Sequence, residues 1–231
     1  MREFNASKTN ARAIGFNGHA TIENVRGLKI VSVLLGCTAG LLGQYTAERT
    51  GAAPAEIAAR VTEVLQPSGF GILNAGVLYC EVWMRASLPD APSSREAGVT
   101  LNTIPAGTLV GVIRFDAAGS DRRGQRIAPG LYTLRYAVLP KNEAHEGVSR
   151  QRDFLVLTPA AEDINPDSRP SFDALVKLST RVSGTPHPAI LTVRKAEADS
   201  PGFSQEGEDW VLQTKLGTIP VQVILIGSVE R

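Results

Sequence analysis

Residues 77–86 read VLYCEVWMRA, and the fold prediction starts from the alternation in this stretch. Every second residue from Leu78 to Met84 is apolar, whereas the positions between them include the charged Glu81. In an extended chain, successive side chains point to opposite faces, so this pattern is typical of a half-buried antiparallel strand. The stretch therefore predicts a sheet that packs one face on a core.

The same period of two recurs along the chain. Residues 131–139 follow an Ala-Pro-Gly turn signal and place Tyr132, Leu134 and Tyr136 on one face. Further strands are expected at 71–73, 99–104, 107–116, 152–158, 190–195, 210–215 and 221–229. Helices are expected at 53–66 and at 172–182, the second capped by Ser171 and stopped by Gly184. These elements predict a mainly β fold, an antiparallel β-sandwich of about eight or nine strands with two accessory helices.

Two polar segments, 117–128 and 197–209, are expected to be loops. The first carries Arg122, Arg123 and Arg126, which we interpret as a solvated loop, with an anion site as the alternative.

The N-terminal part resembles an export signal. Arg26 and Lys29 precede an apolar run at 30–43, which at about 1.5 Å per residue spans roughly 21 Å, less than the roughly 30 Å of a bilayer core. We therefore expect an N-terminal extension and export signal at 1–47, a single β-sandwich domain at 48–231, and a periplasmic or extracellular location. The segment LLGC at 34–37 also matches a lipobox, so soluble release and a lipid anchor on Cys37 both stay open.

Composition narrows the class of partner. The chain has 231 residues and a formal net charge of +1, so it lacks the basic excess that marks nucleic-acid binders. We expect no nucleic-acid partner, and contact with a membrane only through a signal or a lipid anchor. A small molecule, a glycan or an envelope protein are the partners left open.

One strand face and one loop supply candidate ligand-binding residues. Tyr79, Trp83 and Arg85 share a face of the strand at 77–86, and an exposed face of this kind can bind sugar rings or a partner protein. The alternative is that a helix covers this face. His187 stands between two prolines, which restrict the backbone and can hold an imidazole in place for function.

Metal and catalytic signals are weak. His145 lies close to Glu143 and Glu146, a grouping that predicts an oxygen-rich metal site. No nucleophile elbow, zinc-protease motif or nucleotide-binding glycine loop is present, and no cofactor is expected. We expect an exported cell-envelope protein that is a non-enzymatic binding or structural module. The alternative is a metal-dependent or other hydrolase that uses His145 or His187 with nearby carboxylates.

Three stretches carry a family resemblance: GVLYCEVWMR at 76–85, IAPGLYTLRYAV at 127–138 and SFDALVKLSTRVSGTPHPAIL at 171–191. Over residues 53–231 the chain resembles uncharacterised secreted β-sandwich proteins of bacteria, in which a turn followed by G-x-Y-x-L opens a core strand. Gly130, Tyr132 and Leu134 match that motif. The resemblance implies the fold and the compartment, and it implies no activity and no site residue.

Overall fold

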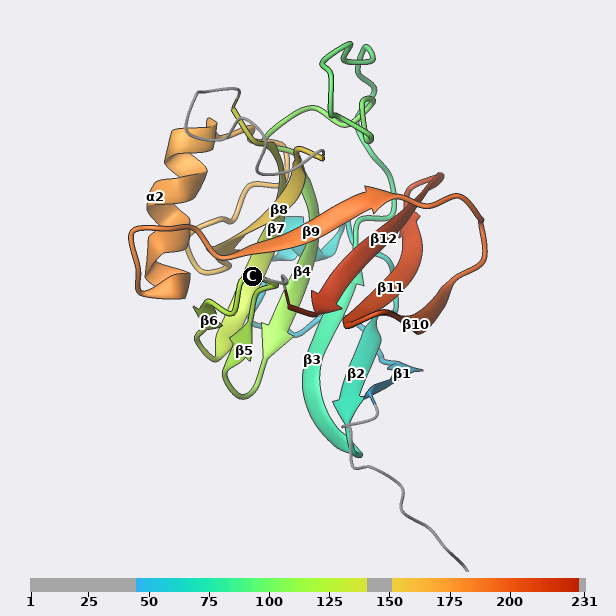
Figure 1. Ribbon diagram of the computed structural model, residues 1–231. Coiled ribbons are helices and arrows are strands. Elements are labelled where there is room, and N and C mark those ends of the chain that lie inside the picture. The colour runs from blue at the N-terminus through green and yellow to red at the C-terminus, as the bar shows by residue number, and fades with distance from the viewer. Residues whose placement is uncertain (1–44, 141–150, 229–231) are drawn as a thin grey trace, which may run out of the picture. The chain divides into compact units, whose positions relative to one another are not determined.

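The computed structural model describes residues 45–140 and 151–228. These residues belong to Leu41–Arg231, the second of two units into which the chain divides. Antiparallel strands form most of this unit, as Figure 1 shows. Within the described residues no helix is long and apolar enough to cross a membrane.

The main sheet has ten strands among the described residues, in the order β1-β2-β3-β4-β7-β8-β9-β12-β11-β10, and every pairing is antiparallel. In chain order its strands are β1 (Tyr45–Arg49), β2 (Phe70–Asn74), β3 (Val77–Met84), β4 (Leu109–Phe115), β7 (Gly130–Val138), β8 (Asp153–Pro159), β9 (Ile190–Lys195), β10 (Gly202–Glu206), β11 (Asp209–Leu216) and β12 (Ile219–Ile226). The remaining elements are the short hairpin of β5 (Gly119–Ser120) and β6 (Arg126–Ile127), and the helices α1 (Ala59–Thr62) and α2 (Phe172–Ser183).

The prediction of a mainly antiparallel β fold with two helices is confirmed, but the prediction of a sandwich of eight or nine strands is wrong. The ten strands form one continuous sheet, nearly barrel-shaped, with one main core. Register shifts at Ile72/Leu73, at Leu109/Gly111 and at Trp210/Val211 interrupt three of the pairings. Such bulges increase local twist, so they allow one sheet to curl around its core where a flatter sheet would pack against a second one.

The predicted inward faces are confirmed except at the start of β3, where Tyr79 and not Leu78 packs against the main core. Cys80, Val82 and Met84 of β3 are buried in the main core, as are Leu134 and Tyr136 of β7. A tight hairpin turn joins β2 to β3 through two residues of positive φ, Ala75 and Gly76. Burial raises the pKa of the Cys80 thiol, so this side chain is an inert core residue in the native protein.

Four element predictions were wrong in extent or kind, among them the loop expected at 117–128, which contains the hairpin of β5 and β6. The helix expected at 53–66 is reduced to the four residues of α1, because Ala58 at its N-cap supplies no capping side chain. The strand expected at 99–104 is absent, since the main-chain amides of Thr100 and Leu101 donate to the Asp153 carboxylate instead of to a neighbouring strand. The loop expected at 197–209 contains β10.

The sheet also begins earlier than expected. The strand β1 includes residues 45–47, which the sequence placed in the N-terminal extension. Helix α2 agrees with its prediction: the Ser171 side chain accepts from the Ala174 amide at 3.3 Å, and Gly184 ends the helix with a φ of 66°.

A buried ion pair holds residues 160–171, the connection after β8, against the outer face of the sheet. The Arg135 guanidinium donates to both oxygens of Asp163, at 2.5 and 2.7 Å, and the carboxylate also accepts from Thr133 and Thr158. Arg135 is fully buried, and it also donates to main-chain carbonyls of the connection at Asn165. Burial raises the pKa of the Asp163 carboxyl, but the hydrogen bonds and the charge of Arg135 outweigh this effect and hold the pKa below its usual value.

We predict that Asp163→Asn lowers the free energy of unfolding at pH 7 by about 3–5 kcal/mol, because it leaves the buried guanidinium without a counter-charge. Since the folded state lowers the pKa of Asp163, the carboxylate stabilises the protein fully above the unfolded value of about 3.9. That contribution is lost as the pH falls through the lower folded pKa, so the difference between wild type and variant should shrink below about pH 4.

Urea unfolding at pH 7, 5 and 3 checks this prediction. The matched control is Glu162→Gln, which removes a neighbouring carboxylate from an exposed pair with Arg181 and should change stability by less than about 1 kcal/mol. A difference for Asp163→Asn that stays constant down to pH 3 would contradict the proposed role of the carboxylate.

Candidate functional site

The two ends of the sheet meet through aromatic side chains of β1 and of the β10–β11 hairpin. The Tyr45 ring of β1 lies edge-on to the Trp210 ring of β11, with centroids 5.5 Å apart, and Trp210 stacks on Phe203 of β10 at 5.4 Å. On its other side Tyr45 contacts Tyr79 of β3 edge-on at 5.7 Å. A continuous aromatic contact therefore joins both ends of the sheet, on the side of Figure 1 where β1 and β10 lie.

A groove of about 510 Å³ opens where these strands approach, a size within the range of small-ligand sites. All five residues of β1 line it, together with residues from β2, β10 and β11. The lining consists of Tyr45, Thr46, Ala47, Glu48, Arg49, Phe70, Pro201, Gly202, Phe203 and Trp210. We call this cavity the seam groove.

The seam groove combines half-buried aromatic rings with two charges. Tyr45, Phe203 and Trp210 are partly accessible to solvent, so their rings can contact a bound molecule. Burial raises the pKa of Tyr45, which keeps its hydroxyl neutral at physiological pH. The Arg49 guanidinium lies 4.3 Å from the centroid of the Phe70 ring. The side chain of Glu48 is exposed, and its carboxylate makes no hydrogen bond or ion pair with another described residue. The arrangement suits stacking and hydrogen bonding.

A second groove, of about 400 Å³, has a different lining. It lies between residues 86–91 and residues 216–219 and is lined by small and aliphatic side chains, with Asp90 as its one charged group. No aromatic ring lines it. It offers less of the chemistry that recognises a ligand than the seam groove does.

Two of the residues predicted to form an exposed binding face are buried. Trp83 is 1% exposed and its indole N–H donates to the Gly51 carbonyl at 2.9 Å. Arg85 is 6% exposed and donates to main-chain carbonyls, among them Pro166 in the connection after β8. Of the two interpretations of this face, the covered one therefore holds for Trp83 and Arg85, because residues around α1 and the connection after β8 cover this part of the sheet.

Tyr79 has a different environment from Trp83. It is half-buried, packs edge-on against Tyr45 and Phe115, and its hydroxyl accepts from the Ser120 amide. Tyr79 therefore packs against the ring of Tyr45 but does not itself line the seam groove. Of the residues predicted to bind a ligand, it is the one that contacts the groove lining.

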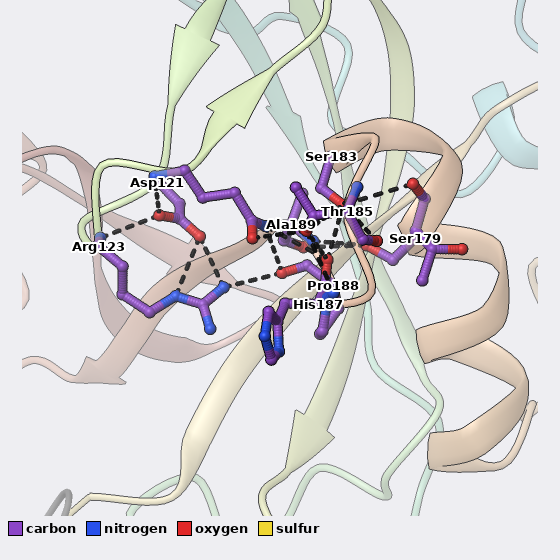
Figure 2. Close-up of polar contacts among 10 residues, drawn as sticks. Asp121, Arg123, Ser179, Ser183, Thr185, His187, Pro188 and Ala189 are labelled. Carbon is purple, nitrogen blue, oxygen red and sulfur yellow. Dashed lines mark hydrogen bonds and ion pairs between the residues drawn. The ribbon is translucent and has the colours of Figure 1, made fainter.

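The loop that carries His187 is held through its main chain, as Figure 2 shows. The His187 carbonyl accepts from the Ser183 hydroxyl at 2.7 Å, and the next carbonyl, that of Pro188, accepts from Arg123 at 2.8 Å. Arg123 in turn pairs with the fully buried Asp121. The imidazole itself is exposed and points away from these contacts, and it forms no hydrogen bond with the part of the chain that the structure describes.

The arginines of the segment 117–128 are largely paired. Arg122 binds Asp209 at 2.9 Å and Arg123 binds Asp121 at 2.7 Å. These carboxylates neutralise the two cations, which weakens the interpretation of this loop as an anion site.

The predicted metal-binding residues Glu143, His145 and Glu146 lie outside the described residues. Among residues 45–140 and 151–228, no group of three or more His, Cys, Asp or Glu side chains is placed to hold a metal ion. Cys37, the candidate for lipid attachment, also lies outside this part of the chain.

Sequence reasoning missed Tyr45 and Phe203 as site residues. Tyr45 follows directly on the apolar run and was placed in the extension, while Phe203 stands among acidic and small residues that indicate a loop. A usable signal was present at Gly207, whose φ of 63° allows the tight turn between β10 and β11.

For the His187 loop we predict that Asp121→Ala lowers the free energy of unfolding by about 1–3 kcal/mol, because the amides of Arg123 and Gln125 lose a buried acceptor. His187→Ala should change it by less than about 0.5 kcal/mol, since the loop is held by main-chain atoms and the ring is exposed. Urea unfolding of both variants measures the difference. Equal losses in the two variants would mean that the imidazole takes part in holding the loop.

Comparison with known proteins adds no name to this site. No protein family, no curated protein and no solved structure matches the chain. The resemblance to secreted β-sandwich proteins of bacteria stays an expectation, and the function of the seam groove has to be argued from its residues.

Proposed function

We propose that the protein is an exported, non-enzymatic binding module of the cell envelope that takes its ligand in the seam groove. The observation that carries this proposal is the contact of Trp210 with Tyr45 and with Phe203, which gathers partly exposed aromatic rings at a groove of about 510 Å³. Aromatic rings provide a large contact area with little loss of conformational entropy, and they are enriched where proteins bind ligands.

Binding is better supported than catalysis. The imidazole of His187 is exposed and has no carboxylate partner in the described part of the chain. Burial raises the pKa of the Cys80 thiol, which removes it as a nucleophile. No specific observation favours the alternative of a hydrolase that uses His145 or His187.

Export is part of the same proposal, and the start of β1 supports a processing point that leaves this strand intact. Because β1 begins at Tyr45, removal of the whole segment 1–47 would take three residues from an edge of the sheet and one aromatic ring from the groove. We place the mature N-terminus at or before Tyr45, downstream of the apolar run that starts at residue 30. The mature protein would then be periplasmic or extracellular, free or attached through lipid on Cys37.

Expression of the full chain in a bacterium with a periplasm tests export. We expect the protein in the periplasmic or membrane-attached fraction, with an intact mass that places its N-terminus between residues 37 and 45. Cys37→Ser separates the two routes, because it should abolish the added lipid mass of a lipid-anchored form and leave the mass of a soluble form unchanged. Full-length protein retained in the cytoplasm would refute export.

For the groove itself, we predict that Trp210→Ala weakens binding of any ligand of the seam groove at least tenfold, because truncation of a central aromatic anchor commonly costs about 2 kcal/mol. The probes are a panel of chito- and cello-oligosaccharides and a library of heptapeptides, measured by calorimetry against wild type. Phe172→Ala is the matched control: this aromatic ring is also half-buried but belongs to α2 and packs near Ala137 and Val156, away from the groove, so its loss should leave affinity within about twofold.

Two results would count against the groove as the binding site. One is an affinity that Trp210→Ala leaves unchanged while the variant keeps the circular dichroism of wild type. The other is the absence of binding by every member of both panels.

A further inference from the structure

We infer that the ligand of the seam groove is an extended peptide segment, which adds as a strand between β1 and β10 with apolar side chains toward the core and basic side chains toward solvent. This inference rests on the proposed binding function and names the class of its ligand.

The argument begins with the two edges of the sheet. β1 pairs with β2 on one side, and β10 pairs with β11 on one side, and neither has a second partner among the described strands. The free edge of a strand presents a row of unpaired N–H and C=O groups, which is a template for another strand. The seam groove is lined by all of β1 and by the start of β10, so both edges border the same cavity.

The directions of the two edges constrain how a strand can enter. Nine antiparallel pairings separate β1 from β10, so the two strands run in opposite directions. The aromatic contacts agree, because Tyr45 at the start of β1 touches Trp210, whose register partner is Gln205 near the end of β10. A single inserted strand would be antiparallel to one edge and parallel to the other, and both kinds of pairing form regular ladders.

The size of the groove sets the length of the segment. A strand residue occupies roughly 160 Å³ within a sheet, from a rise of about 3.3 Å, a spacing of about 4.8 Å and a thickness of about 10 Å. A groove of about 510 Å³ therefore encloses about three residues, with the rest of the peptide running along the edges of β1 and β10.

The side chains at the two edges predict the pattern of the peptide. Tyr45 and Ala47 of β1 and Phe203 of β10 pack against the main core. The alternate positions of β1, including Glu48, therefore point outward. An inserted strand would place alternate side chains beside these apolar groups, where apolar residues fit. Its other side chains would lie beside Glu48, which is exposed and has no ion-pair partner among the described residues, so Lys or Arg fits there.

On the β10 side, the exposed carboxylate is already paired with an arginine, so the unpaired negative charge is that of Glu48. Glu206, at the end of β10, is also exposed, and its carboxylate is shared between Arg194 and Gln222. Arg49, the next residue of β1 after Glu48, has its guanidinium over the Phe70 ring. The outward surface beside the groove is thus acidic near Glu48, which favours a basic peptide over an acidic one.

The test uses a blocked heptapeptide in which Lys and Val alternate, with four Lys and three Val. Three matched peptides serve as controls: one of the same composition with the Val residues contiguous, one with Glu in place of Lys, and one with alternate amides N-methylated. We expect the alternating Lys peptide to bind at least tenfold more tightly than the contiguous and N-methylated forms, because strand addition needs the period of two and the main-chain donors.

Reversal of the charge at Glu48 tests whether the outward side chains of the peptide lie beside it. Glu48→Lys should weaken binding of the Lys peptide at least fivefold and strengthen binding of the Glu peptide. The matched variant Glu63→Lys changes an equally exposed carboxylate outside the groove and should change neither by more than about twofold. Hydrogen exchange provides a second readout, because strand addition should slow amide exchange in both β1 and β10.

The outcomes separate this inference from the proposed function. Equal binding of the N-methylated peptide, or no slowing of exchange in β1 and β10, overturns strand addition. If no peptide binds but an oligosaccharide does, with a loss in Trp210→Ala, the proposed function stands and the inference falls. If nothing binds, both fall. Self-association of the protein alone that slows exchange in β1 and β10 would assign the groove to a second copy, which also overturns the inference.

Discussion

Burial of one face of one continuous sheet is the constraint on which the rest of this structure depends. The inward side chains of its strands share a single core, from Ile72 of β2 to Val223 of β12. A sheet of this width can bury that face by itself only if it curls, and its three register shifts provide the extra twist. The curl brings β1 and the β10–β11 hairpin together through Tyr45 and Trp210.

The outer face of the sheet is largely covered as well. Residues around α1 pack on Trp83, α2 packs on Val156, and the connection after β8 is held by Arg85 and Arg135. Apolar surface is thus occupied on both faces, and accessible aromatic rings gather where the two ends of the sheet meet. The candidate site is a consequence of how the sheet curls.

Features set by local interactions could be predicted from the sequence. The alternation around Cys80 and Tyr136 and the caps of α2 at Ser171 and Gly184 depend on neighbouring residues, and these predictions are confirmed. The choice between one sheet and two could not be predicted in this way, because it depends on bulges and on pairings between distant strands. Alternation also separates two faces without showing which is covered, which is why the sequence left open whether Trp83 is exposed.

The groove was harder to predict than the fold, for two physical reasons. Tyr45 follows an apolar run that predicts export, and Phe203 lies in an edge strand whose other side chains are polar, as solvent-facing edges require. Neither residue has a local signal that links it to the other. Their proximity arises only from the tertiary structure.

The contact between Tyr45 and Trp210 has a consequence for how the chain folds. It joins residues that are far apart in the sequence, so a very long loop must be closed to form it. Contacts of this kind form slowly. Until these contacts form, the folding protein exposes two unpaired sheet edges, which can associate with other chains. Slower synthesis or lower temperature should then raise the yield of native protein, because fewer chains expose these edges at the same time.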